Sequence, residues 1–193
     1  MARPLTFDRD AALDAIKQTF WARGYEATSM QDIEGATGLK KQSLYRLYGD
    51  KQGMYRAALM HYESHEVAAA EAFLRQGAGT GAGRITQVFT SVVDTALTTQ
   101  DRRGCFLCNA SVDVALLDQD SRTQVRMMME RVRQAFLGAL IADQGGASEA
   151  LEGAADGLLA LYNGLRVLIK AESAETVLRH VVQQAGILVA RAR

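Results

Sequence analysis

The sequence predicts an all-α protein in which a head of three short helices is followed by a larger body of long helices. Proline is nearly absent, and Pro4 precedes the first helix, so no proline interrupts a helix interior. Apolar residues recur at helical spacing along most of the 193 residues, and no stretch shows the alternation of a strand. Hydrophobic residues make up 48% of the chain and charged residues 23%, which supports a sizeable core and excludes a disordered chain.

The first two helices have recognisable ends. Residues 8–23 form the first, with an apolar stripe of Ala12, Ile16 and Phe20. Gly24 ends it. Ser29, followed three residues later by Asp32, is typical of the start of a second helix, which Gly38 ends.

A third short helix covers about 40–47, and after the turn at Gly49 and Asp50 a long helix runs from 51 to about 75. Residues 76–83 hold four glycines, which should break any helix. This segment is the best candidate for a linker, or else a loop inside the body. Further helices are expected at 84–98, 105–117, 120–143, 148–170 and 174–191. We therefore predict a head domain at 1–50 and a body at 51–193.

Charge is unevenly distributed. The formal net charge is zero, but residues 37–56 carry five cations and one anion, Asp50. No apolar run approaches the roughly 20 residues of a membrane span, and the N-terminus lacks a hydrophobic signal region. Two cysteines do not make a secreted disulfide scaffold, so a cytoplasmic protein without membrane contact is expected.

Residues 40–48 combine an apolar inner face with a polar outer face. Leu44, Leu47 and Tyr48 point inward, which leaves for the outside Lys40, Lys41, Gln42, Ser43, Tyr45 and Arg46. Two short helices joined by a glycine turn form a helix-turn-helix, whose second helix reads the major groove. Base edges and phosphates need this mixture of donors and acceptors, so the sequence predicts contact with double-stranded DNA.

Residues 24–59 resemble the DNA-binding domain of the TetR family of bacterial transcriptional repressors. The matching positions, in order and spacing, are Gly24-Tyr25, Thr28-Ser29, Asp32-Ile33, Gly38-Leu39, Leu44-Tyr45, Tyr48 and Lys51. Glu34 stands where the family often has a small residue; its charge is expected to face solvent, with some effect on packing between the short helices. Gln42 replaces the usual glycine and bears on base choice.

The resemblance implies roles for individual residues. Tyr45 would contact the DNA backbone, Lys51 would bind a phosphate, and Thr28 with Ser29 would place a hydroxyl and a helix N-terminus at another phosphate. The expected base readers are Lys41, Gln42, Ser43 and Arg46, with Lys40 beside them. A solvated surface is the alternative for each.

A helix-turn-helix unit usually works in pairs that read half-sites about 34–36 Å apart. The resemblance implies a homodimer through the last two helices. Within residues 154–168 a stripe of small and apolar residues suits close helix packing: Ala154, Gly157, Ala160, Leu161, Gly164 and Leu165. The alternative is that these helices are internal core.

The middle helices would then enclose a pocket for a small-molecule inducer, which acts by favouring one spacing of the two heads. Its expected walls are Phe89, Val93, Cys105, Phe106, Asn109, Met128, Met129, Phe136 and Tyr162. Methionine and aromatic side chains suit irregular apolar pockets, although ordinary core is the alternative. No cofactor is expected.

Cys105 and Cys108 lie three residues apart at a predicted helix start, beside Arg102 and Arg103. A helix N-terminus and nearby cations lower a thiol pKa, so a reactive thiolate is one hypothesis. A Gly-Cys here also resembles a TetR subgroup with members that sense electrophiles or oxidants. The alternatives are a buried hydrophobic cysteine and, with less support from a single CxxC, a zinc site.

The sequence gives little support for a metal-binding protein or an enzyme. His61 and His65 share a helix face, but no third metal ligand is evident, so no metal site is expected. The sequence shows no phosphate-binding loop and no spacing of a catalytic triad. Cys105 would be the one candidate nucleophile for an enzyme. The alternatives to a ligand-released repressor are therefore a repressor that senses oxidants or electrophiles through Cys105 and a helical sensor without operator binding.

Overall fold

The computed structural model describes residues 8–113 and 117–192, and every regular element in these two stretches is helical. The predicted all-α fold is thus confirmed, while the tail with Pro4 lies outside the described residues. The elements are α1 (Arg9–Arg23), α2 (Met30–Thr37), α3 (Lys41–Tyr48), α4 (Lys51–Tyr62), the π-helical segment η1 (Glu63–Val67), α5 (Ala68–Gln76), α6 (Gly81–Thr99), α7 (Phe106–Val112), α8 (Gln119–Gln144), α9 (Glu149–Lys170) and α10 (Glu175–Arg191).

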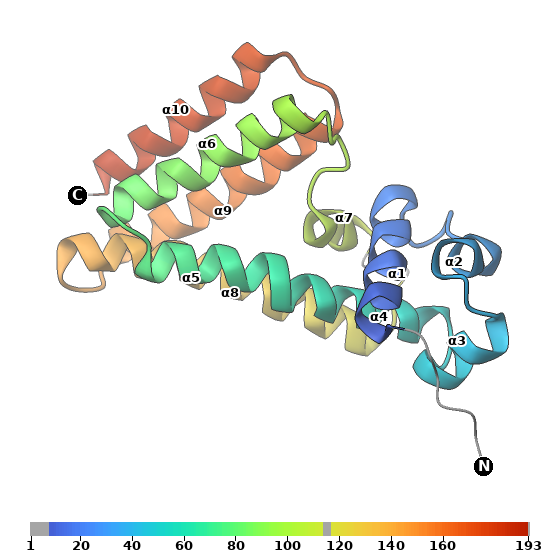
Figure 1. Ribbon diagram of the computed structural model, residues 1–193. Coiled ribbons are helices and arrows are strands. Elements are labelled where there is room, and N and C mark those ends of the chain that lie inside the picture. The colour runs from blue at the N-terminus through green and yellow to red at the C-terminus, as the bar shows by residue number, and fades with distance from the viewer. Residues whose placement is uncertain (1–7, 114–116, 193) are drawn as a thin grey trace.

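The head, formed by α1, α2 and α3, lies at one end of the molecule, and the C-terminus lies at the other (Figure 1). Helices α4, η1 and α5 run as one rod from the head into the body, with α8 alongside. Helices α6, α9 and α10 form a second layer, and α7 lies between that layer and the head (Figure 1).

Two groups of buried side chains hold this arrangement together. The body core joins α5, α6, α8, α9 and α10 through Leu74, Ile85, Phe89, Val93, Phe136, Leu158, Leu165 and Leu178. The head core joins α1, α2 and α3 to α4, α7 and α8 through Ile16, Phe20, Ile33, Leu44, Tyr55, Leu59, Phe106 and Met128. The core of the head therefore continues past residue 50 into the rod and α7.

The helix predicted from 51 to about 75 is not regular. After Tyr62 it widens into the π-helical segment η1 and returns to α-helix at Ala68. A π-helical turn accommodates one more residue than an α-helical turn and often occurs at a functional site. The rod thus has one irregular point, where it passes from the head to the body.

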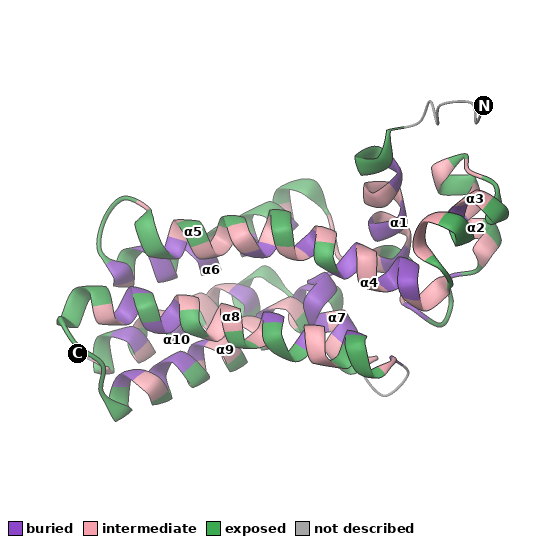
Figure 2. Ribbon diagram, turned by 90° about the horizontal axis from the view of Figure 1, so that it is seen from below, coloured by how far each residue is buried: buried purple, intermediate pink, exposed green. Residues whose placement is uncertain are grey.

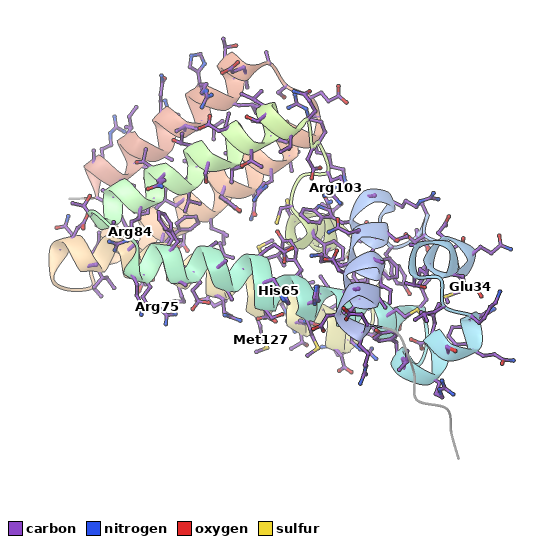
Figure 3. The ribbon with its side chains drawn as sticks, viewed as in Figure 1. Glu34, His65, Arg75, Arg84, Arg103 and Met127 are labelled. Atoms are coloured by element: carbon purple, nitrogen blue, oxygen red, sulfur yellow. The ribbon has the colours of Figure 1, made fainter. Side chains whose placement is uncertain are left out.

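The glycine-rich segment is a loop inside the body, and α6 begins at Gly81 rather than at residue 84. The backbone N–H of Gly81 donates to Asp143 Oδ1 at 2.7 Å, and a Cβ on this glycine would lie 1.8 Å from the carbonyl oxygen of Ala139. Arg84, labelled in Figure 3, closes the loop by donating to the carbonyl of Gly79 at 2.7 Å. Tertiary contacts therefore override the low helix propensity of glycine here.

Helix α7 is shorter than the predicted helix at 105–117. It begins at Phe106 and ends at Val112, Asp113 is a bend, and residues 114–116 lie outside the described residues. The predicted ends of the last three helices lie within one residue of the observed ends.

Candidate DNA-binding surface and regulatory pocket

Helix α2 begins with a reciprocal capping box. The Ser29 hydroxyl oxygen accepts from the backbone N–H of Asp32 at 3.2 Å, and the Asp32 carboxylate accepts from the backbone N–H of Ser29 at 2.8 Å. Gly38 ends the helix with φ +68°, a conformation that favours glycine. The local sequence therefore fixes both ends of the first helix of the helix-turn-helix pair.

Glu34 of α2 fixes the start of α3. Its Oε1 accepts from the backbone N–H of Lys41 at 2.7 Å, whereas the residue at the cap position, Lys40, makes no side-chain capping bond. Figure 3 shows Glu34 at the outer end of the head. The sequence-based expectation of a solvent-facing charge was incomplete, because this carboxylate connects the two short helices.

Helix α3 presents the face that the sequence predicts. Leu44 is fully buried and anchors the helix in the head core, while Leu47 and Tyr48 are partly buried. The remaining side chains of this segment are mostly exposed, namely Lys40, Lys41, Gln42, Tyr45 and Arg46; exposed residues are green in Figure 2. Ser43 is half-buried at the edge of this face.

Lys51 is positioned at the first turn of α4. Its Nζ donates to the carbonyl of Glu26 at 3.3 Å and lies 4.6 Å from the ring centroid of Tyr25. These contacts hold the ammonium beside the segment that precedes α2. A cation in a fixed position at a helix N-terminus is well suited to a phosphate.

Thr28 and Ser29 have different environments. Thr28 is buried, at 1% exposure, and its hydroxyl donates to the carbonyl of Gly24 at 2.7 Å. Its side chain therefore supports the turn and is not part of the exposed surface, contrary to the expectation of a phosphate-facing hydroxyl. Ser29 is exposed at the N-terminus of α2.

A cavity of about 290 Å³ lies where the head meets the body. Four of the nine predicted pocket residues line it: Cys105, Met129, Phe136 and Tyr162. The other five do not. Phe89, Val93, Phe106 and Met128 are buried in the two cores. The Asn109 side chain donates to the carbonyl of Arg103 and accepts from Lys170.

Several residues of the cavity wall were not predicted from the sequence. Trp21 comes from α1, Tyr62 and Glu66 from the rod at and beside η1, and Arg166 from α9. Arg166 had a visible signal in the sequence, because it is the one charged residue between Asp156 and Lys170, where most residues are apolar or small. Trp21 and Tyr62 had none, because their neighbours in sequence predict ordinary core.

The wall of the cavity connects the head to the body. The rings of Trp21 and Tyr62 meet edge to face with their centroids 5.3 Å apart. The Trp21 ring also contacts the Arg103 guanidinium, which lies 4.3 Å from the ring centroid. Lys17 of α1 forms an ion pair with Glu66 of η1 at 2.7 Å. A molecule in the cavity would therefore touch side chains of both parts at once.

Both cysteines are free and buried. Cys105 immediately precedes α7, is 4% exposed, and its Sγ lies 3.2 Å from Tyr62 Oη. Burial raises the pKa of the Cys108 thiol, which opposes a thiolate at that residue. The Arg103 guanidinium binds Asp101 at 2.7 Å, so its charge is already paired.

His61 and His65 lie together, with ring centroids 4.2 Å apart. His65 Nδ1 lies 2.8 Å from the carbonyl oxygen of His61, and His61 Nε2 lies 3.6 Å from Asp14 Oδ1. Within residues 8–113 and 117–192, no group of three His, Cys, Asp or Glu side chains is placed to hold a metal ion.

The small and apolar stripe of α9 divides between two environments. Ala154 and Leu165 are buried in the body core, whereas Ala160 and Gly164 are exposed. Three larger apolar side chains are also exposed on the last two helices, Val167 at 52%, Val177 at 42% and Ile187 at 44%. The outer face of α9 and α10 is therefore partly apolar.

The protein resembles known regulators in sequence and structure. A family model described as "Bacterial regulatory proteins, tetR family" matches residues 12–58. The HTH-type transcriptional repressor ComR of Escherichia coli is 34% identical over 138 residues, which span 70% of this chain and 66% of the relative. The chain belongs to the TetR family. The HTH-type transcriptional repressor DhaR of a Mycobacterium species is 26% identical over 159 residues, or 80% of this chain and 78% of the relative.

Solved structures of other proteins share the fold. A cysteine-substituted form of the regulator CifR, complexed with a 26-bp operator DNA, is 27% identical and superposes with a TM-score of 0.81 over 95% of this chain and 98% of that chain. The reduced form of NemR from E. coli superposes with a TM-score of 0.83 over 92% of this chain and 94% of that chain, at 19% identity.

Membership of the TetR family makes this chain a DNA-binding transcriptional regulator rather than an enzyme. Of the helices that the structure describes, none is both long enough and apolar enough to cross a membrane.

Proposed function

We propose that this TetR-family protein is a homodimeric repressor that binds an operator and leaves it when a small molecule enters the cavity. The observation that carries the proposal is the exposed polar face of α3, which Glu34 and Leu44 fix on the head. The 27% identity to CifR, which was solved on operator DNA, supports it. Action on chromosomal DNA would place the protein in the cytoplasm.

The proposed DNA contacts are of two kinds: contacts to phosphates, which position the protein, and contacts to base edges, which read the sequence. We assign phosphates to Lys51, Tyr45 and the N-terminus of α2 at Ser29, because these groups lie at helix ends or reach outward. We assign base edges to the exposed side chains at the start and middle of α3, which are Lys41, Gln42 and Arg46 with Ser43 at their edge. Lys40 extends the basic surface.

Two copies are proposed to pair through α9 and α10. Apart from its own stretch of helix, no described atom lies within 4 Å of a Cβ added to the exposed Gly164, so another helix can approach its backbone closely. Val167 and Ile187 supply apolar area for the same contact. Two heads held in this way would read two half-sites.

The cavity is proposed to receive the inducer because its wall includes Trp21 of the head and Arg166 of the body. A ligand that fits one arrangement of these elements better than another shifts the spacing of the two heads. The boundary near residue 50 between a DNA-reading part and a regulatory part stays a proposal, and α4 on its far side packs with the head.

The test is binding of the purified protein to the DNA upstream of its own gene, compared with random DNA at the same salt concentration. Selective binding by a dimer is expected. Selection from a random DNA library covers the case of an operator elsewhere. If neither DNA is bound selectively, the protein is a sensor without operator binding and the proposal is wrong.

Thiol sensing is a second candidate, favoured by the position of Cys105 in the cavity wall. We expect hydrogen peroxide or N-ethylmaleimide to release operator DNA from the natural protein and from Cys108→Ser, but not from Cys105→Ser. Equal release from Cys105→Ser would exclude this residue as the sensor.

A further inference from the structure

Arg166 is a cation in the cavity wall, and none of the described acidic side chains forms an ion pair with it. Its guanidinium donates to Tyr162 Oη from Nη2 at 2.8 Å and from Nε at 3.2 Å. Among the residues that the structure describes, no carboxylate lies within ion-pair distance of it. A guanidinium has five N–H donors, and the two bonds to Tyr162 leave three of them without a partner among the described residues.

Nearby groups do not neutralise this charge. Glu66 also lines the cavity; its Oε1 is bound to Lys17 at 2.7 Å, and its Oε2, buried without a hydrogen-bond partner among the described residues, does not pair with Arg166. Asp101, whose pKa is lowered chiefly by hydrogen bonds from Arg103 and slightly by Arg166, is held by Arg103 at 2.7 Å. Burial raises the pKa of Tyr62 and of Tyr162, so both phenols are neutral at physiological pH.

The rest of the wall is mainly apolar. Aromatic and aliphatic side chains from seven α-helices and η1 surround the cavity, among them Trp21, Val88, Val92, Leu107, Met129 and Phe136. Its volume of about 290 Å³ is at the lower end of the range for ligand pockets. The space therefore suits one aromatic ring or a short alkyl chain.

We propose that the cavity binds a small amphipathic carboxylic acid, with the carboxylate on Arg166 and the apolar part against Trp21 and Phe136. This inference rests on the proposed function, because it names the chemical class of the inducer. Arginine matches a carboxylate in geometry and charge, and the apolar surroundings strengthen their hydrogen bonds. A cation in a largely apolar wall is stabilised when an anion joins it.

The experiment uses the fluorescence of Trp21, the single tryptophan of the chain, which lines the cavity. The probes are benzoate, phenylacetate and hexanoate, each paired with its primary amide, which has a similar shape but no charge. Each is titrated up to about 10 mM without DNA. We expect at least one acid to saturate the signal and to bind about tenfold or more tightly than its amide, as for a lost charge-assisted bond.

Variants locate the interaction. Arg166→Gln should reduce the affinity for that acid about tenfold and leave the amide unaffected, whereas Arg166→Lys should keep part of the preference. Arg75→Gln, on α5 outside the cavity wall, is the matched control and should bind like the natural protein. Circular dichroism checks that each variant folds. If Arg166→Gln does not fold, the proposal is tested by the affinities of Arg166→Lys and by the comparison of acid with amide on the natural protein.

The proposal is overturned if no acid binds, if amides bind as well as acids, or if a folded Arg166→Gln keeps the preference for the acid. Operator binding is measured on the same samples. Loss of operator binding with intact acid binding would refute the proposed function alone, and the reverse result would refute this inference alone.

Discussion

Lys17 of α1 binds Glu66 of η1, with 2.7 Å between Nζ and Oε1. The Lys17 side chain is only 4% exposed, and Asp14 supplies a second carboxylate at 2.7 Å. The two carboxylates raise the pKa of Lys17 against the opposing effect of its burial. One ion pair thus ties the head to the irregular point of the rod.

Glu66→Gln should lower the free energy of unfolding by about 1 kcal/mol, because it weakens the pair while Asp14 still partners Lys17. Urea denaturation followed by circular dichroism measures it. Glu172→Gln, at an exposed residue after α9, is the matched control and should change stability little. Equal effects of the two variants would show that the pair does not stabilise the junction.

Lys51→Ala should weaken binding to operator and random DNA alike and reduce the salt slope by about one, because a phosphate contact carries no sequence information. Gln42→Ala should instead change discrimination at one base position by about 1–3 kcal/mol. Fluorescence anisotropy over a range of salt concentrations separates the two. Identical changes on specific and random DNA for both variants would contradict the assigned roles.

Glu34→Ala should destabilise the head by about 1 kcal/mol, because the N–H of Lys41 loses its acceptor. Glu34→Gln retains an acceptor and should cost less. Hydrogen exchange at the Lys41 amide, measured by NMR, reports the local loss directly. Unchanged protection of that amide in Glu34→Ala would show that another group caps α3.

Gly164→Arg should convert the dimer into a folded monomer. A single chain has room for the side chain, since Gly164 is exposed with nothing near an added Cβ, but a closely packed partner helix has none. Analytical ultracentrifugation measures the mass, and Met127→Arg, at a 62% exposed residue of α8, is the control. A Gly164→Arg variant that stays dimeric would place the interface elsewhere.

Acid should weaken the start of α2. Hydrogen bonds from Ser29, aided by the charge of Arg23, lower the pKa of Asp32 in the folded protein. The resulting stabilisation is present above the unfolded pKa of about 4 and is lost as pH falls through the folded pKa. In urea unfolding between pH 7 and pH 3, Asp32→Asn should thus lose less stability on acidification than the natural protein. Parallel pH profiles for the two proteins would refute this.

The sequence predicted the elements whose ends depend on local contacts. Ser29 and Asp32 mark α2 because they bond to one another, and Gly38 supplies a conformation that few other residues adopt. The start of α6 at Gly81 was not predicted from the sequence, because it depends on a contact with Asp143, 62 residues away. The π-helical turn was missed because no residue type distinguishes it from α-helix in an apolar pattern.

The two predicted sites also differ in whether they depend on local or on distant contacts. The DNA-binding face lies within one short segment, so the residue types on α3 were enough to define it, although its contacts stay a prediction. The cavity brings together Trp21, Cys105 and Arg166 from distant parts of the chain. Helical spacing alone cannot distinguish such a wall from core residues like Phe89 and Met128.

The π-helical segment Glu63–Val67 makes the length of the rod adjustable at one point. A chain shortened by one residue there could close into regular α-helix, and Leu74 would still face the body core. A one-residue deletion within α5 would instead rotate every later residue of the rod by about 100° about the helix axis. The apolar side chains of those residues would then face solvent. Among relatives of this protein, single-residue length differences in the rod are therefore expected to gather at this turn, where they would also change the pairing of Glu66 with the head.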